Sequence, residues 1–121
     1  MTDIQRHHTN ARISKIVRHG GLLYLCGQTA KGSPSAASDI SAQTTEVLSR
    51  VDALLAEGGS DRTRLLTVTI YLRDIADFAA MNIVWEAWLA GMQAGAPART
   101  TVEAALATEM PSSRPIMCVG R

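Results

Sequence analysis

The 121-residue sequence has little of what defines a secreted, disulfide-stabilised or metal-binding domain. Its only two cysteines, Cys26 and Cys118, lie far apart and outside any Cys-x-x-Cys spacing. We therefore expect free thiols in a reducing compartment. The three histidines, His7, His8 and His19, have no metal-ligand spacing, and a partly exposed strand explains them equally well. No metal and no other cofactor is expected.

The sequence also has no large excess of positive or negative charge. Twelve Lys and Arg residues against eleven Asp and Glu residues give a net charge of +1, and the basic residues are scattered. This pattern predicts no nucleic-acid partner. No apolar run approaches the length that crosses a bilayer, and residues 1–10 lack the apolar core of a signal peptide. We expect a cytoplasmic protein without a membrane partner, folded as a single domain over residues 1–121.

The first third of the chain predicts a hairpin followed by a loop. The apolar-rich runs 15–19 and 22–26 flank Gly20-Gly21, and two glycines tolerate the positive φ angles of a two-residue turn. Residues 31–38 are rich in Gly, Pro and Ser, which indicates a loop.

Two helices are predicted from apolar residues at helical spacing. The first begins at Ser38 or Asp39 and ends at Gly58-Gly59. The second begins at Asp74, with Asp77 in its first turn. The expected buried stripes are Ile40, Thr44, Val47, Leu48, Val51, Leu54 and Leu55 in the first helix, and Phe78, Met81, Trp85, Trp88, Leu89 and Met92 in the second.

Three strands complete the pattern. Residues 65–72 alternate, with Leu66, Val68, Ile70 and Leu72 on the side under the helices, which predicts a central strand. Arg99 opens another strand just after Pro97. The last strand, residues 114–119, contains Pro115, so it is either an edge strand or begins after the proline.

These elements predict an α+β fold, in which a largely antiparallel sheet carries both helices on one face. The opposite face would present Thr67, Thr69 and Tyr71 with apolar neighbours. A half-apolar open face on so small a domain predicts that copies of the chain cover it in a closed homo-oligomer.

Arg99 is the strongest candidate for chemistry. A strand that starts at a constrained proline directs this guanidinium to one face, where its donors match a carboxylate in two parallel hydrogen bonds. Taken alone, the segment fits an ordinary surface arginine better, either solvated or paired with an acidic neighbour, because surface ion pairs are common and weak.

In order along the chain, several motifs resemble the YjgF/RidA family of imine and enamine deaminases. The matching segments are Leu25-Cys26-Gly27-Gln28, Gln43-Thr44, residues 54–59, residues 67–72, Asp77-Phe78-Ala79-Ala80-Met81-Asn82 and Pro97-Ala98-Arg99-Thr100-Thr101-Val102-Glu103. The paired Trp85 and Trp88, together with residues 11–14, resemble the YoaB-like branch.

This resemblance implies a chorismate-mutase-like fold and a homotrimer with three clefts between subunits. In the clefts Arg99, the implied catalytic residue, would bind the carboxylate of a small 2-imino or 2-keto acid. Asn82 matches the family's asparagine at the cleft mouth, although a polar position in a helix is an equally good explanation. The other substrate-binding positions implied by the resemblance are Thr100, Thr101, Cys26, Gly27 and Ile13.

Two departures from the family pattern concern the chemistry. Ile13 stands where the family has a tyrosine, and Met117 stands where it has a glutamate thought to position the attacking water. Glu103 shares a strand face with Arg99 but lies roughly 13 Å along the strand, too far to replace that glutamate. Cys26 has no neighbouring base that would make it a nucleophile.

Three functions remain open at this point. The first is hydrolysis of 2-imino or enamine acids to 2-keto acids and ammonia, weakened by Met117. The second is non-catalytic binding of small 2-keto acids or other carboxylates by the same trimer. The third is a structural trimer with a vestigial cleft. A ribonuclease role, sometimes attached to this family, finds no support in the charge pattern.

Overall fold

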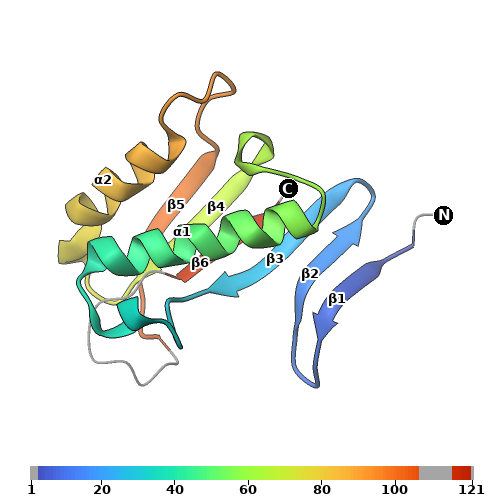
Figure 1. The fold of residues 1–121 in the computed structure, drawn as a ribbon, viewed down its shortest axis with the longest axis horizontal. Helices are drawn as coiled ribbons and strands as arrows, with labels where there is room; N and C mark the ends of the chain where they lie inside the picture. The colour runs from blue at the N-terminus through green and yellow to red at the C-terminus, as the bar shows by residue number, and fades with distance from the viewer. Residues whose placement is uncertain (1–2, 107–115, 121) are drawn as a thin grey trace.

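The computed structural model describes residues 3–106 and 116–120, with the backbone alone at residues 37 and 116–120 (Figure 1). The elements in chain order are β1 (Gln5–Thr9), β2 (Ser14–His19), β3 (Leu22–Gln28), η1 (Pro34–Ala37), α1 (Ile40–Glu57), η2 (Arg62–Arg64), β4 (Thr67–Leu72), η3 (Ile75–Asp77), α2 (Phe78–Leu89), β5 (Ala98–Glu103) and β6 (Ile116–Gly120), where η denotes a short 3-10 helix.

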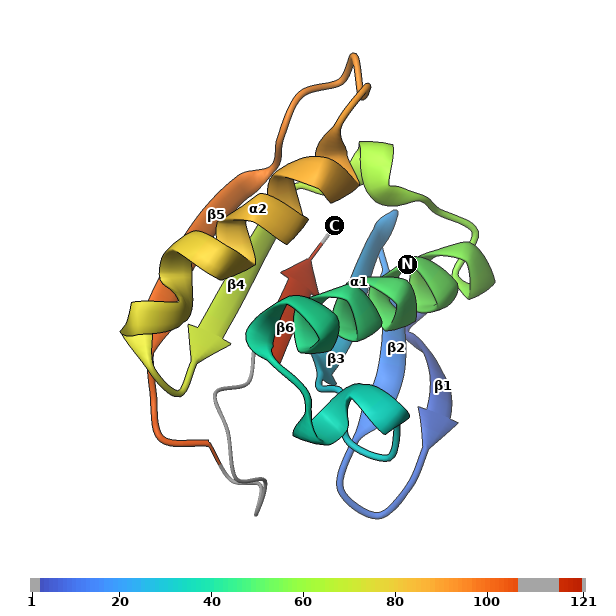
Figure 2. The same cartoon turned by 60° about the vertical axis from the view of Figure 1, so that its left-hand side comes forward.

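The six strands form one sheet in the order β1-β2-β3-β6-β4-β5. All neighbouring pairs are antiparallel except β4 and β5, which are parallel because α2 connects them as a crossover. Both helices cover the same face of this sheet, and the β1–β2 end extends beyond α1 (Figures 1 and 2). The predicted α+β architecture is confirmed.

The last strand is central in the sheet. β6 lies between β3 and β4, so the expectation of an edge position is wrong, whereas the alternative of a start beyond Pro115 is confirmed. A strand that begins at Ile116 keeps proline out of the ladder, where its missing N–H would leave a carbonyl unpaired. The first two residues of the predicted span, 114 and 115, lie outside the described part of the chain.

The hydrophobic core lies between the sheet and the helices. In β4, Val68, Ile70 and Leu72 are fully buried, as their alternation predicts. Leu66 was expected on this side but is 57% exposed, because the strand begins only at Thr67 and the preceding Leu65 fills the core instead. The helical contribution to the core comes from Ile40, Val47, Leu48, Val51, Leu55, Met81 and Trp85.

Helix boundaries follow the predicted caps, with three corrections. Asp39 accepts a hydrogen bond from the N–H of Ala42 at 2.9 Å and caps α1, which ends before Gly58. Asp74 instead caps η3, the short turn that leads into α2. In addition, α2 ends at Leu89, so Met92 follows the helix, and η1 occupies part of the predicted loop 31–38.

The sheet face opposite the helices is not covered by any described element. Tyr24 and Leu22 of β3 are 47% and 38% exposed there, and Thr69 and Tyr71 of β4 are only partly buried. The face therefore combines threonines with large apolar side chains, as predicted for a surface that a second copy would cover.

Gly58, at the end of α1, packs directly on the core. A Cβ atom built there would lie 2.5 Å from one methyl carbon and 2.9 Å from the other methyl carbon of Leu23, which is completely buried. Because the φ angle of Gly58 is an ordinary −78°, only this overlap decides the effect of a side chain. We predict that Gly58→Ala lowers the free energy of unfolding by about 1–3 kcal/mol, measured by urea denaturation. The exposed α1 control Ser49→Ala should change it by less than about 0.5 kcal/mol, and equal values for the two variants would contradict the prediction.

Candidate functional site

Arg99 lies on the helix-covered face of β5, the edge strand. Its partner in the parallel register is Val68, which points into the core, so Arg99 lies beneath α2. The guanidinium carbon is 5.5 Å from the ring centroid of Trp85 and 5.6 Å from that of Phe78. These distances are in the range of cation–π attraction. The two aromatic rings of α2 therefore hold the guanidinium in place.

The donors of Arg99 have no partner within the described residues. No hydrogen bond or ion pair there includes this guanidinium, whereas Arg50, Arg62 and His8 in the same part of the chain each pair with an acidic side chain. The alternative of a strand arginine paired with an acidic neighbour thus finds no support in this part of the chain. A planar fork of donors that is positioned but unpaired is suited to binding a carboxylate in two parallel hydrogen bonds.

A groove of about 510 Å³ runs beside Arg99 between α2 and the segment that enters β5. Its walls are Asn82, Trp85, Glu86, Leu89, Met92, Gly95, Ala96, Pro97 and Arg99. The predicted residues Arg99 and Asn82 therefore share one groove. The Oδ1 atom of Asn82 and the Oγ1 atom of Thr101, two residues beyond Arg99 on the same face of β5, are buried without a hydrogen-bond partner in the described structure. Buried polar atoms that lack a partner are uncommon, and a ligand in the groove would supply one to Asn82, which lines it.

The other predicted residues lie elsewhere on the sheet. Cys26 and Gly27 are on β3, which β6 and β4 separate from β5, so roughly 14 Å of sheet lies between them and Arg99. Ile13 follows β1 and is one strand further away. The chain therefore divides the predicted site residues into two groups at different places on the sheet.

Thr100 also faces away from the groove. It alternates with Arg99 and Thr101, and its side chain lies on the open face of the sheet. The N–H groups of Ala98 and Ala104 donate to the carbonyls of Leu66, just before β4, and Leu72 of β4. By the alternation of a parallel ladder, the N–H of Thr100 also donates toward β4. The backbone donors at the free edge of β5 therefore come from Arg99 and Thr101.

Cys26 is a half-buried thiol at an irregularity in the pairing of β3 with β6. Burial raises the pKa of the Cys26 thiol, and this effect outweighs the opposing influences of Lys15 and of a hydrogen bond from Nε2 of Gln28 at 3.2 Å. A raised pKa keeps the neutral thiol at pH 7, which is the opposite of what a nucleophile requires.

Glu103 has a structural contact in place of a catalytic one. Its Oε1 atom accepts a hydrogen bond from the N–H of Ile75 at 2.9 Å, at the start of η3. The side chain thus fixes the turn that leads into α2. This contact agrees with the expectation that Glu103 cannot serve the Arg99 site.

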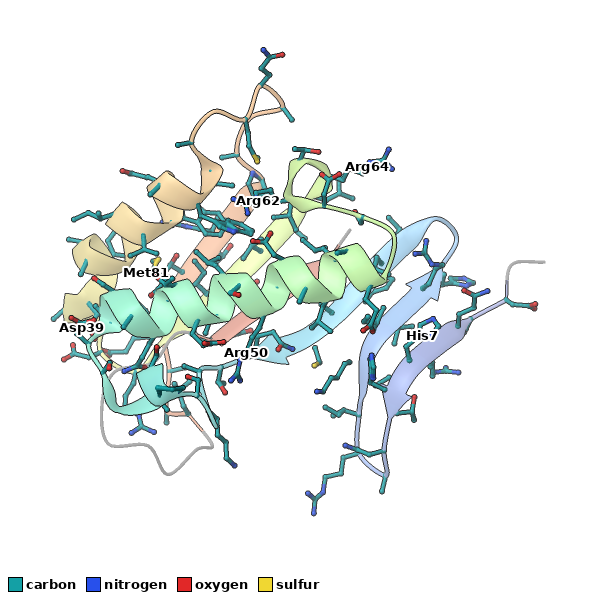
Figure 3. All side chains as sticks on the ribbon, in the orientation of Figure 1. His7, Asp39, Arg50, Arg62, Arg64 and Met81 are labelled. Atoms are coloured by element: carbon teal, nitrogen blue, oxygen red, sulfur yellow. The ribbon has the colours of Figure 1, made fainter. Side chains whose placement is uncertain are left out.

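The sequence did not single out the residues that position the aromatic rings. Asp52 of α1 accepts hydrogen bonds through one oxygen from Nη2 of Arg62 at 2.7 Å and from Nε1 of Trp88 at 2.9 Å. Arg62 also donates to the carbonyl of Trp88 at 2.6 Å, and its guanidinium lies 4.8 Å from that ring. Trp88 in turn lies 5.6 Å from Trp85 between centroids. Figure 3 shows Arg62 extending from η2 toward α2.

Neither a metal site nor a membrane span is found among the described residues. No three His, Cys, Asp or Glu side chains gather there in an arrangement that would hold a metal ion. No helix in the same part of the chain combines the length and apolar character needed to cross a bilayer.

Comparison with known proteins places this chain and its fold in a family. The family model described as Endoribonuclease L-PSP matches residues 4–112. A RutC family protein from Haemophilus influenzae is 40% identical over 106 residues, which cover 86% of each chain. The RutC family protein YoaB from Escherichia coli is 39% identical over 103 residues, which cover 85% of each chain. A crystal structure of a YjgF-family protein from Neisseria meningitidis superposes with a TM-score of 0.81 at 41% identity, covering 98% of this chain and 92% of that one.

These matches show that the chain belongs to the YjgF/RidA family, and its sheet with two helices on one face is the chorismate-mutase-like fold of that family. Within the family it is YoaB-like. The resemblance inferred from the sequence motifs is confirmed.

The contacts of Asp52 predict a specific loss of stability. Asp52→Ala removes the shared acceptor of Arg62 and Trp88, so we expect the free energy of unfolding to fall by about 1–2 kcal/mol. Chemical denaturation monitored by tryptophan fluorescence would measure it. The control Glu46→Ala removes the more ordinary i,i+4 ion pair with Arg50 and should cost about 0.5 kcal/mol or less. A loss no larger for Asp52→Ala than for the control would contradict this role.

The raised pKa of Cys26 predicts slow thiol chemistry. In a Cys118→Ser variant at pH 8, iodoacetamide should alkylate Cys26 more slowly than it alkylates cysteine in an unstructured peptide, because less thiolate is present and access is partial. The rate should approach the peptide value when the protein is denatured in urea. Alkylation of the native protein as fast as the peptide would overturn the assignment of Cys26 as an inert residue.

Proposed function

We propose that this protein hydrolyses small 2-imino and enamine acids to 2-keto acids and ammonia in clefts between subunits of a homotrimer. The observation that carries the proposal is the Arg99 guanidinium, held between two aromatic rings beside a groove and without an acidic partner in the described chain. Membership of the YjgF/RidA family supports the same reaction class.

A cleft between copies follows from the division of the site residues. Arg99, Thr101 and Asn82 form one half beneath α2, whereas Cys26, Gly27 and Ile13 lie several strands away. Residues so far apart can serve one small substrate only if different copies supply the two halves. The uncovered face of the sheet, with Tyr24 and Leu22 exposed, supports such an association.

The mechanism assigns binding and polarisation to Arg99. Two parallel hydrogen bonds hold the substrate carboxylate, and the positive charge makes the adjacent imine carbon more electrophilic. Water adds to this carbon as the C=N π electrons move to nitrogen, and both protons of that water pass to the nitrogen. The C–N bond then breaks, which leaves a 2-keto acid and releases ammonia. The free backbone N–H groups of Arg99 and Thr101 at the sheet edge are available to orient the attacking water.

The rate enhancement we propose is modest. Free imines hydrolyse readily in water, so little acceleration is required compared with slow reactions. Met117, which stands where the family has its glutamate, can neither accept a proton nor orient water, and loss of a general base costs about 10² to 10⁴ in rate. Residue 117 lies in β6, of which the structure describes the backbone alone.

A second candidate is a non-catalytic trimer that binds small 2-keto acids or other carboxylates. Met117 and Ile13 favour it, since neither can act on a proton. This candidate predicts thermal stabilisation by a keto acid that depends on Arg99, without release of ammonia. A ribonuclease activity is not proposed, because the groove contains a single arginine and an acidic residue, Glu86, and so offers no continuous positive surface for a phosphate backbone.

Replacing Arg99 tests the reaction and its binding step. For 2-iminopropanoate generated in situ, Arg99→Ala should lower kcat/KM by about 10²-fold, because a charge-assisted contact to the carboxylate is lost. Disappearance of the imine and release of ammonia would be followed against the spontaneous rate. Arg99→Lys should retain part of the activity, since lysine keeps the charge but not the fork.

Arg64→Ala provides the matched control. It removes the same charge from an exposed position on η2, and Figure 3 shows Arg64 directed away from the body of the protein. Equal turnover by Arg99→Ala and Arg64→Ala would remove Arg99 from the mechanism. Keto-acid stabilisation that depends on Arg99, with turnover at the spontaneous rate, would select the binding candidate.

A further inference from the structure

We infer that Glu86 sets the substrate class of the Arg99 groove by favouring 2-imino acids whose side chain carries a positive charge. The inference rests on the proposed function, because it takes Arg99 to bind the substrate carboxylate. Glu86 has no counterpart among the site residues predicted from the sequence.

The groove contains one cation and one anion that do not neutralise each other. Arg99 and Glu86 both line it, yet they form no ion pair. Glu86 is exposed, and within the described residues its carboxylate has neither a hydrogen bond nor an ion pair. Two unpaired charges of opposite sign in one groove are available to opposite ends of a single ligand.

The position of Glu86 on α2 brings it close to the Arg99 site. Trp85, the preceding residue, contacts the Arg99 guanidinium, and Asn82 lies one helical turn earlier on the same wall of the groove. Glu86 therefore extends that wall by one turn from Asn82. A ligand held at Arg99 by its carboxylate and at Glu86 by its side chain would pass along this wall.

The groove is larger than a three- or four-carbon acid requires. Its volume of about 510 Å³ lies in the range of pockets that hold whole ligands, roughly 300–1,000 Å³. Leu89 and Met92 give it an apolar wall beside Trp85. Methylene groups of an arginine-length side chain can pack on this wall while the terminal charge remains near Glu86.

The charge of Glu86 also acts against other substrates. A carboxylate in the side chain of a substrate would be repelled by Glu86, and an uncharged side chain would gain nothing from it. In an exposed groove, one charge pair contributes up to about fivefold in affinity. We therefore expect Glu86 to produce a preference of about fivefold for a substrate with a positively charged side chain.

The test compares three imino acids on the same variants. Amino acid oxidases would generate them from arginine, norleucine and glutamate, and imine disappearance would give kcat/KM for each. In Glu86→Gln, the ratio of the arginine-derived to the norleucine-derived substrate should fall about fivefold. In Glu86→Lys it should fall further, and the ratio of the glutamate-derived to the norleucine-derived substrate should rise. Glu46→Gln, which removes the same charge from α1, should leave both ratios unchanged.

Two outcomes would overturn the inference. One is an unchanged ratio in both Glu86 variants without any general loss of activity. The other is an equal loss for all three substrates, which would give Glu86 a part in the chemistry, such as holding the attacking water. Failure of the proposed function would be seen separately: Arg99→Ala would then turn over every substrate as fast as the wild type. If the wild type turns over none of the three substrates, thermal stabilisation of the protein by the three matching 2-keto acids would measure binding instead. The ratios of their affinities would then be compared between the wild type and the Glu86 variants.

Discussion

The site depends on one contact, the guanidinium of Arg99 between the rings of Phe78 and Trp85. A long, flexible side chain on an edge strand would ordinarily sample many orientations, and each carboxylate it bound would have to fix it first. The two rings remove much of that freedom before a ligand arrives. The guanidinium also lines the groove, so a ligand in the groove can reach its N–H donors.

The contact of Arg99 with the two rings depends on a series of further side-chain contacts. Asp52 and Arg62 fix Trp88, which lies against Trp85, and Glu103 fixes the turn from which α2 begins. Residues of α1, η2 and β5 thus determine the orientation of α2 over the edge of the sheet. A substitution far from the groove can therefore alter the orientation of the Arg99 guanidinium through the position of the two rings.

The sequence predicted the architecture well because its signals were local. Alternation in β4, the caps Asp39 and Gly58, and the Gly-Gly hairpin each reflect the conformation of neighbouring residues. The central position of β6 could not be read in this way, because a proline beside a short strand is compatible with either an edge or a late start.

The candidate site was predicted only in part. Pro97 and the strand that follows indicated Arg99, but its partners Trp85 and Phe78 lie on a helix, 14 and 21 residues earlier in the chain. The apolar stripe of α2 identified Trp85 as a core residue, and nothing local distinguishes a ring that packs from one that also holds a cation. Glu86 gave no signal at all, since an exposed glutamate on a helix is ordinary until a groove is seen beside it.

The central claim is that one small acid is bound by residues from two copies of the chain. It can be tested by mixing Arg99→Ala with Gly27→Val, which damages the other half of the cleft at a glycine whose φ angle is not positive. After co-refolding at equal amounts, a cleft with both halves intact forms in about one quarter of the interfaces of a closed oligomer. The account predicts that two inactive variants regain about one quarter of the wild-type imine hydrolysis, in a particle of three times the 13.0 kDa chain mass. Mixed protein as inactive as its components, although each variant alone assembles normally, would contradict it.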